Sequence, residues 1–179
     1  MPIKFPLLRI DNLILRQIVA ADISNIYKGL SDPIVIEYYG VSYKSLAETE
    51  AQMDWFSSLE KNENGIWWAI TGVNDQLFYG AIGLNNLTKP HKKAEIGFWL
   101  LPDYWGKGIM NKALTTVCNY AFKVLNLHRI EAFVETGNIS SKKILIKSNF
   151  SHEGTMVDCE IKNENYISLE CYAKIHQQS

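Results

Sequence analysis

The chain has no long apolar run and no excess of basic charge, and each shortage argues against a class of protein. A membrane-spanning helix needs about 18 or more consecutive apolar residues, and no such run occurs, so we expect no membrane span. The formal net charge is −1 at pH 7, so no basic field favours binding to nucleic acid. The first residues lack the long apolar segment of a signal peptide, and a cytoplasmic location is therefore expected.

Cysteine is also scarce. Cys118, Cys159 and Cys171 form no Cys-x-x-Cys pair and no cluster with the four histidines. This pattern indicates neither a disulfide framework nor a zinc site, so we expect free thiols and no metal. Repeats, low-complexity segments and linkers are missing too, which favours a single domain over residues 1–179. With 47% apolar and 12% aromatic residues, that domain has ample material for a packed core.

Segments with a two-residue apolar period and segments with a period near 3.6 follow one another, which predicts a mixed α+β fold. Strands are expected at 13–18, 65–73, 77–87, 94–101, 128–136, 152–161 and 166–175. Helices are expected at 20–30, from Ser45 to about Lys61, at 110–125 and at 138–150. The Ser-x-x-Glu that begins at Ser45 has the form of a capping box, and Asn149 suits the left-handed end of a helix.

The lengths of the connections predict the order of the strands. Short turns join the strands between 65 and 101, and the last two strands form a hairpin across residues 162–165, so these neighbours should be antiparallel. The helix between strands 94–101 and 128–136 is instead typical of a crossover between parallel neighbours. We therefore expect a sheet of six to seven strands, mostly antiparallel, with one parallel βαβ joint and flanking helices.

The stretch "YWGKGIM" at 104–110 lies where this strand gives way to this helix. Glycines at the amino end of a helix let a phosphate approach the unpaired backbone N–H groups of the first turn. The P-loop pattern GxxxxGK[ST] fails here, because position 101 is leucine and Gly108 follows Lys107. The dinucleotide pattern GxGxxG also fails, because Asn111 occupies the place of its third glycine.

At this turn the sequence resembles the GNAT N-acetyltransferases, whose acetyl-CoA signature Q/R-x-x-G-x-G/A maps onto residues 105–110. It is most similar to the ribosomal-protein N-terminal acetyltransferases of the RimJ/RimL type. "AEIGFWL" leads into "YWGKGIM", and "RIEAFV", "NISS" and "NFSHEG" follow in the same order. The resemblance covers about residues 8–175 and implies the GNAT fold. Trp105, Met110 and Asn149 depart from the usual residues of these motifs.

The resemblance implies that acetyl-CoA lies along the strand, across the glycine turn and against the following helices. The implied contacts are Phe98, Trp99, Leu100, Trp105, Gly106, Lys107, Gly108, Ile109, Met110, Asn111, Asn138 and Ser141. Within that set we expect Lys107 to face solvent and Asn138 also to cap its helix. Lys142, Lys143 and Lys147 form either a solvated helix face or a site for the 3′-phosphate of CoA.

The acceptor amine must be neutral when it attacks the thioester. An α-amino group with a pKa of about 7.8 loses its proton far more readily near neutral pH than a lysine with a pKa of about 10.4. A carboxylate acting through a water is then a sufficient base. Glu95 lies on the strand that the family uses for pantetheine, so it is either this base or a partner of a lysine across the sheet. Glu131 and Glu135 are the alternative bases.

The leaving thiolate needs a proton, and the family often supplies it from a tyrosine at the position of Leu145. Ser141 is the nearest hydroxyl on that helix, so we expect it to assist the thiolate, with Ser141 and Leu145 on the same side of the cleft. A backbone N–H near Phe98 to Leu100 can stabilise the oxyanion where the central strands separate. The aromatic groups at 38–43 and 67–68 either line the acceptor groove or pack in the core.

The sequence therefore predicts an acetyl-CoA-dependent N-acetyltransferase without a metal, acting on the α-amino group of a protein N-terminus in a ternary complex. One alternative is transfer to a small amine such as a polyamine or an aminoglycoside. Residues 31–45 contain only Asp32 and Glu37 as acidic residues, which disfavours such cationic acceptors. A second alternative is a CoA-sensing module without turnover, which Leu145 favours. A homodimer is among the assemblies that the sequence leaves open.

Overall fold

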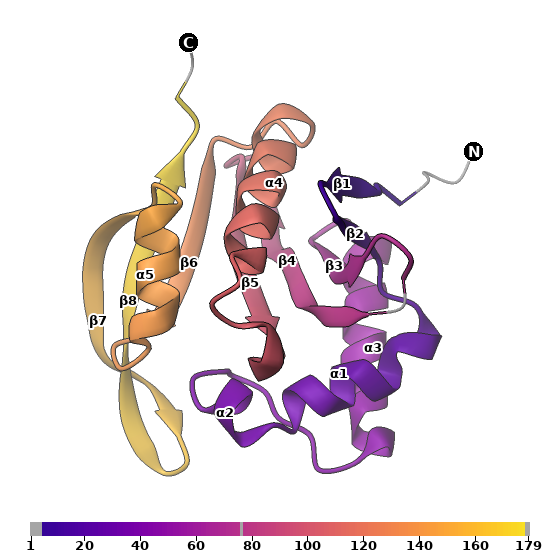
Figure 1. Ribbon diagram of the computed structural model, residues 1–179. Helices are drawn as coiled ribbons and strands as arrows, with labels where there is room; N and C mark the ends of the chain where they lie inside the picture. The colour runs from indigo at the N-terminus through magenta and orange to yellow at the C-terminus, as the bar shows by residue number, and fades with distance from the viewer. Residues whose placement is uncertain (1–4, 76, 178–179) are drawn as a thin grey trace.

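The computed structural model describes residues 5–75 and 77–177, so Gln76 and the ends of the expected 1–179 domain lie outside the described residues. Eight strands form one sheet in the order β1-β2-β3-β4-β5-β6-β8-β7 (Figure 1). The strands are β1 (Leu8–Ile10), β2 (Leu13–Gln17), β3 (Ile66–Gly72), β4 (Phe78–Thr88), β5 (Lys93–Leu100), β6 (Arg129–Glu135), β7 (Ser151–Lys162) and β8 (Asn165–Ile175). The α-helices are α1 (Ile23–Leu30), α2 (Pro33–Ile36), α3 (Leu46–Lys61), α4 (Ile109–Lys123) and α5 (Ile139–Lys147).

The mixed α+β class and the strand connections are confirmed. Every neighbouring pair of strands is antiparallel except β5 and β6, which are parallel and are joined through α4. At the start of α3, the Ser45 hydroxyl accepts a hydrogen bond from the Glu48 N–H at 3.2 Å. Asn149 has a φ of 62°, so the predicted left-handed residue after α5 is also confirmed.

The expected sheet of six to seven strands was too small, because β1 was missed. This strand has three residues, too few to produce a recognisable two-residue period, and Asp11 with a φ of 48° turns the chain directly into β2. The short helix α2 was missed for the same reason, since its four residues make about one turn. Asp32 caps α2 by accepting a hydrogen bond from the Ile34 N–H at 2.9 Å.

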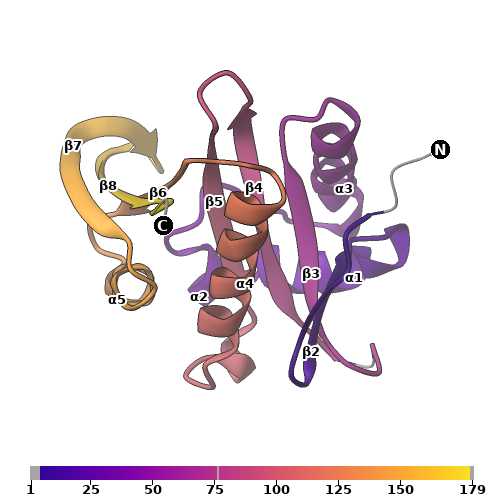
Figure 2. The same ribbon diagram turned by 90° about the horizontal axis from the view of Figure 1, so that it is seen from above.

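Helices cover both faces of the sheet. Alternate residues of β3 enter different cores, so Trp68 and Ile70 join the cluster that packs against α4, whereas Trp67 and Ala69 join the cluster under α1 and α3. Figure 2 shows α4 on one face of the sheet and α3 on the other. Burial on both faces explains why β3 reads as an almost continuous apolar run. No helix in the described part of the chain is long and apolar enough to cross a membrane.

The sheet opens between β5 and β6. Their pairing covers only Lys93–Glu95 and Arg129–Glu131, although β5 continues to Leu100 and β6 to Glu135. Beyond Glu95 the two strands diverge, and β6, β8 and β7 curve away from the rest of the sheet (Figure 2). The predicted separation of the central strands near Phe98 to Leu100 is therefore confirmed. It leaves a wedge between the two halves of the sheet, and both cavities described below lie there.

Candidate active site

The turn between β5 and α4 presents backbone to an open space. Gly106 and Gly108 have φ values of 72° and 75°, a left-handed conformation that favours glycine. A Cβ built on either glycine would meet no atom within 4 Å. Gly108 is the N-cap of α4, and no side chain caps the helix. The N–H groups of its first turn are therefore placed to bind an anion.

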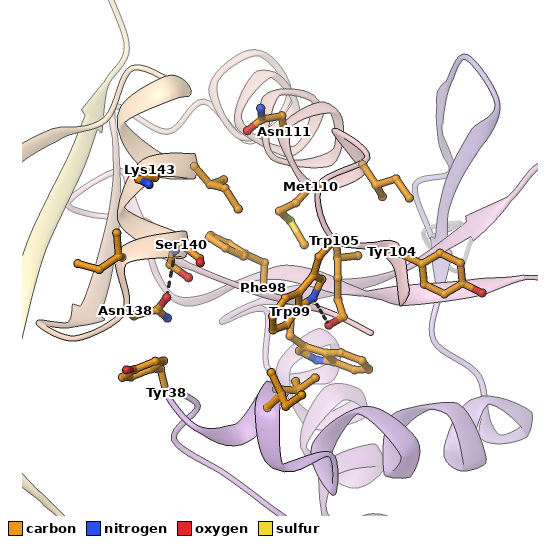
Figure 3. A pocket seen from close by; sticks show the side chains of 18 of the residues that line it. Tyr38, Phe98, Trp99, Tyr104, Trp105, Met110, Asn111, Asn138, Ser140 and Lys143 are labelled. Atoms are coloured by element: carbon orange, nitrogen blue, oxygen red, sulfur yellow. Dashed lines mark hydrogen bonds between the residues drawn. The ribbon is translucent and has the colours of Figure 1, made fainter. Parts of the chain in front are cut away.

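A cavity of about 700 Å³ lies beside this turn, between α2, β5, α4 and α5 (Figure 3). We call it the cofactor cleft. Apart from Lys107, every contact implied by the resemblance lines it: Phe98, Trp99, Leu100, Trp105, Gly106, Gly108, Ile109, Met110, Asn111, Asn138 and Ser141. The ammonium of Lys107 instead lies over the Tyr104 ring, 5.4 Å from the ring centroid. The expectation that Lys107 points to solvent agrees with this position.

Two side chains show how the turn is held. The indole Nε1 of Trp105 donates a hydrogen bond to the Leu100 carbonyl at 2.8 Å, which ties the turn back to β5 (Figure 3). Asn111 lies in the first turn of α4, and its Oδ1 is buried without a hydrogen-bond partner among the described residues. A buried, unpaired acceptor is unfavourable unless a ligand or water completes it. The glycine turn therefore fits phosphate groups, whereas the Asn111 Oδ1 needs a donor such as an amide N–H or a water.

The opposite wall of the cofactor cleft comes from α5. Asn138 caps this helix, because its Oδ1 accepts a hydrogen bond from the Ser141 N–H at 3.0 Å, as predicted. Lys143 and Lys147 line the cleft. Lys142 does not, because its ammonium forms an ion pair with Glu170 at 2.8 Å. Of the three lysines considered for the 3′-phosphate of CoA, Lys143 and Lys147 are therefore available and Lys142 is not.

A second cavity of about 540 Å³ lies on the side of α3 and the 38–43 segment. We call it the acceptor cavity. Its lining includes the aromatic side chains of Tyr38, Tyr39, Tyr43, Trp55, Trp67, Phe98 and Phe133. The aromatic groups at 38–43 and 67–68 were expected either to line the acceptor groove or to pack in the core, and both occur. These tyrosines and Trp67 line the cavity, whereas Trp68 is fully buried in the core.

The floor of the acceptor cavity depends on two glycines in adjacent strands. Trp67, Gly83 and Gly97 are register partners across β3, β4 and β5. A Cβ on Gly83 would lie 2.2 Å from the Trp67 Cγ, and one on Gly97 would lie 2.9 Å from its Cζ2. The indole therefore extends over both glycines and spans three strands. The packing of Trp67 over these two glycines could not be predicted from the sequence, because it depends on the register between the strands.

The two cavities share part of their lining, and this shared wall marks where their occupants can meet. The residues common to both are Tyr38, Tyr39, Phe98, Asn138 and Ser141. Ser141 is thus placed at the junction, whereas Glu95 lines only the acceptor cavity. The sequence did not predict that Tyr38 and Tyr39 would line both cavities. The signal for it was the pair of tyrosines in "YYG", directly after the short helix α2 that was also missed.

The three candidate carboxylates have different surroundings. Glu95 accepts a hydrogen bond from the amide of Asn86 at 2.9 Å, and no lysine partner is found for it among the described residues. Burial alone would raise the pKa of Glu131, but hydrogen bonds from Arg129 and Lys93 lower it overall.

Glu135 forms an ion pair with Lys162 at 2.6 Å. Of the described residues that line the acceptor cavity, Glu95 alone carries a carboxylate. Burial raises the pKa of Tyr39, and the negative charge of Tyr43 in its ionised form and of Glu95 raises this pKa further.

The expected position of Leu145 was wrong. Its side chain is fully buried in the main core, whereas Ser141 and Ile144 line the cofactor cleft. Four residues advance a helix by slightly more than one turn, and that rotation moves Leu145 onto the face that packs inward. A tyrosine at 145 would therefore enter the core and would not reach the thiolate.

No group of three or more metal-binding side chains is found in residues 5–75 and 77–177.

Comparison with known proteins places these features in a family. A family model described as an acetyltransferase (GNAT) domain matches residues 12–151. The uncharacterized N-acetyltransferase YoaA of Bacillus subtilis (strain 168) is 35% identical over 170 residues, which cover 94% of this chain and 96% of that protein.

Two solved structures with low sequence identity have the same fold. The ribosomal L7/L12 α-N-protein acetyltransferase RimL in complex with coenzyme A has a TM-score of 0.85 at 21% identity, over 95% of this chain and 98% of that one. The spermidine N-acetyltransferase of Vibrio cholerae in complex with CoA and spermine has a TM-score of 0.82 at 20% identity, over 93% and 96% of the two chains.

Proposed function

The chain belongs to the GNAT acetyltransferase family, and from the premise that it is an acetyl-CoA-dependent N-acetyltransferase we propose that its acceptor is the α-amino group of a protein N-terminus. The observation that carries the proposal is the single carboxylate, Glu95, among the described residues of the acceptor cavity. A polyamine brings several ammonium groups, and each needs a carboxylate or water when it is buried. A peptide N-terminus brings one amine, and the likeness to RimL supports the same reading.

We place acetyl-CoA in the cofactor cleft with its pyrophosphate over residues 105–111. The left-handed glycines and the uncapped start of α4 supply backbone N–H groups for the pyrophosphate. Lys143 and Lys147 then lie on the wall that would face the 3′-phosphate. The pantetheine arm follows the unpaired edge of β5 beyond Glu95, where Asn138 is the side chain from α5 that meets it.

The reaction in this arrangement is direct attack of the amine on the thioester at the junction of the two cavities. Glu95 takes a proton from the acceptor ammonium through a water, and the neutral nitrogen forms a bond to the acetyl carbon. A backbone N–H in Phe98 to Leu100 donates to the carbonyl oxygen as it becomes negative. The carbon–sulfur bond then breaks as the nitrogen gives up its second proton to water. The hydroxyl of Ser141 donates a hydrogen bond to the thiolate, which takes its proton from that water.

Glu131 and Glu135 are weaker candidates for the base. Neither lines the acceptor cavity, and both are held in ion pairs, Glu131 by Arg129 and Lys93 and Glu135 by Lys162. A carboxylate in an ion pair is a poorer proton acceptor, because the neighbouring cation stabilises its charged form.

The test is release of free CoA thiol from acetyl-CoA with a panel of acceptors. The panel contains short peptides that begin with serine, alanine or methionine, the same peptides with blocked N-termini, spermidine and an aminoglycoside. We expect turnover with the free peptides and none with the blocked ones. Turnover with spermidine alone would reject the peptide acceptor and favour a polyamine, which the Vibrio cholerae neighbour supports.

Binding of CoA without turnover of any acceptor in the panel would instead favour a non-catalytic sensing module. The cytoplasmic location stays a prediction from the sequence, and a homodimer stays among the assemblies that the sequence leaves open.

A further inference from the structure

One lysine at the end of the β7–β8 hairpin joins three segments that are far apart in the sequence. The ammonium of Lys162 donates a hydrogen bond to the backbone carbonyl of Glu37, just after α2. The same ammonium forms an ion pair with Glu135, the last residue of β6, at 2.6 Å. Figure 1 shows the tip of this hairpin and α2 at the same end of the molecule.

The chain that Lys162 holds is the acceptor loop, which we define as residues 37–43. Tyr38 and Tyr39 in this loop line both cavities, and the loop continues along the acceptor cavity to Tyr43. The Tyr38 ring also rests against Gly137, where a Cβ would lie 2.9 Å from the Tyr38 Cε1. The loop is thus closed over the start of α5, and Tyr38 lies next to Asn138 in Figure 3.

The position of Lys162 is itself well fixed. Asn163 and Glu164 form the two-residue connection between β7 and β8, and both have positive φ values, 50° and 65°. Positive φ at both central residues is the geometry of tight two-residue hairpin turns. The Lys162 and Glu135 side chains are only 22% and 15% exposed. This is therefore a partly buried contact, unlike an ion pair on the open surface, which contributes little.

We propose that Lys162 is a positioning residue that holds the acceptor loop closed over the junction of the two cavities. It acts through the Glu37 carbonyl and orders Tyr38 and Tyr39 against the wall that both substrates share. Glu135 fixes the ammonium from the opposite side, so its role is to hold Lys162. The inference concerns the loop and holds for any acceptor amine, so it does not depend on the protein N-terminus proposed above.

Amide hydrogen exchange tests the proposal without any acceptor. The N–H groups of Tyr39 and Tyr43 are bonded to the carbonyls of Ile36 and Leu30 at 3.1 and 3.0 Å, so their exchange reports opening of the loop. Lys162→Met should speed exchange at both amides by about tenfold to a hundredfold, the usual effect of losing a charged hydrogen bond. Lys162→Arg keeps a cationic donor and should restore most of the protection.

Lys174→Met is the matched control. Lys174 also donates to a backbone carbonyl, that of Ser148 at 2.9 Å, and it lies over the Phe150 ring. It therefore ties β8 to the end of α5 and lines neither cavity. We expect this variant to leave exchange in the acceptor loop unchanged.

A kinetic measurement adds a second criterion. With whichever acceptor the panel selects, Lys162→Met should raise the acceptor KM about tenfold, while the affinity for CoA measured by calorimetry changes by less than about threefold. Unchanged exchange at the Tyr39 and Tyr43 amides would overturn the proposal, and so would equal effects of Lys162→Met and Lys174→Met.

If Lys162→Met fails to fold, Glu135→Gln replaces it, because this change removes the charge partner and keeps the lysine. A rise in loop exchange in Glu135→Gln supports the proposed role of Lys162 in holding the acceptor loop, and unchanged loop exchange rejects it.

Discussion

Replacing Gly108 by alanine separates the backbone requirement of the turn from its proposed role in binding. An alanine forced to the φ of 75° found at Gly108 costs about 1–2 kcal/mol, because its Cβ crowds its own carbonyl. No further clash is expected in the free protein, since the added Cβ has no neighbour within 4 Å. A domain of ordinary stability, about 5–15 kcal/mol, therefore stays folded.

The same empty space is where we place the pyrophosphate, so binding should suffer more than folding. Displacing the phosphate from one or two backbone N–H groups removes hydrogen bonds to a charged group, each worth about 1.5–3 kcal/mol. We expect the Kd for CoA to rise at least about tenfold and up to several hundredfold. Isothermal calorimetry with CoA measures the affinity, and urea unfolding measures the stability.

The matched control is Asn149→Ala, which also places alanine at a left-handed position, with a φ of 62°, but outside both cavities. It should lose less stability than Gly108→Ala, because asparagine already carries a Cβ at this φ, and it should keep its affinity for CoA. Equal CoA affinity in folded Gly108→Ala and in the control would refute the placement of the pyrophosphate on this turn.

Three further outcomes are expected. Glu95→Gln should lower turnover at neutral pH, and raising the pH should restore part of it because more amine is then neutral; a loss independent of pH in a pH–rate profile would indicate positioning. Ser141→Ala should reduce kcat by roughly ten- to a hundredfold with little change in CoA affinity, and full turnover would leave water as the proton source. Arg129 lowers the pKa of Glu131 against burial, and that of Glu153 chiefly by its hydrogen bond. The stability that these lowered values provide is complete above the unfolded pKa of about 4.3 and is lost as the pH falls below it. Urea unfolding between about pH 5 and pH 3 should therefore show a smaller acid-induced loss in Arg129→Gln than in the unchanged protein.

Most of the fold could be predicted because its long elements have clear periods. The 3.6-residue pattern of α4 and the alternation in β8 each depend on many side chains, so one irregular residue does not hide them. The elements that were missed, β1 and α2, are too short to have a period. Their stability comes from neighbours, β1 from pairing with β2 and α2 from the cap of Asp32.

The residues that line the cofactor cleft could be named in advance, because the motifs that carry the family resemblance are local in the sequence. The glycine turn, the start of α4 and the Asn138 cap each lie within a few residues of the motif that indicates them. The acceptor side is built from contacts across the sheet and between distant segments, such as Trp67 over Gly97. A single sequence does not contain the register that brings such residues together, and the inward rotation of Leu145 was missed for a similar reason.

The register between β5 and β6 also explains why Glu95, the carboxylate that we propose as the base, is not engaged by Lys93 or Arg129. Glu95 lies opposite Glu131, and the preceding residues on the same face, Lys93 and Arg129, are register partners as well. Both cations make their ion pairs with Glu131, so that carboxylate stays charged and engaged. Glu95 is bonded instead to the neutral amide of Asn86. It lies at the last paired position before the strands diverge, so its carboxylate can face the acceptor cavity without a competing cation. Adding a cation beside it, as Asn86→Lys would, should therefore stabilise the charged carboxylate and weaken it as a base, seen as a lower kcat at neutral pH with CoA affinity unchanged. Unaltered turnover in this variant would argue against Glu95 as the base.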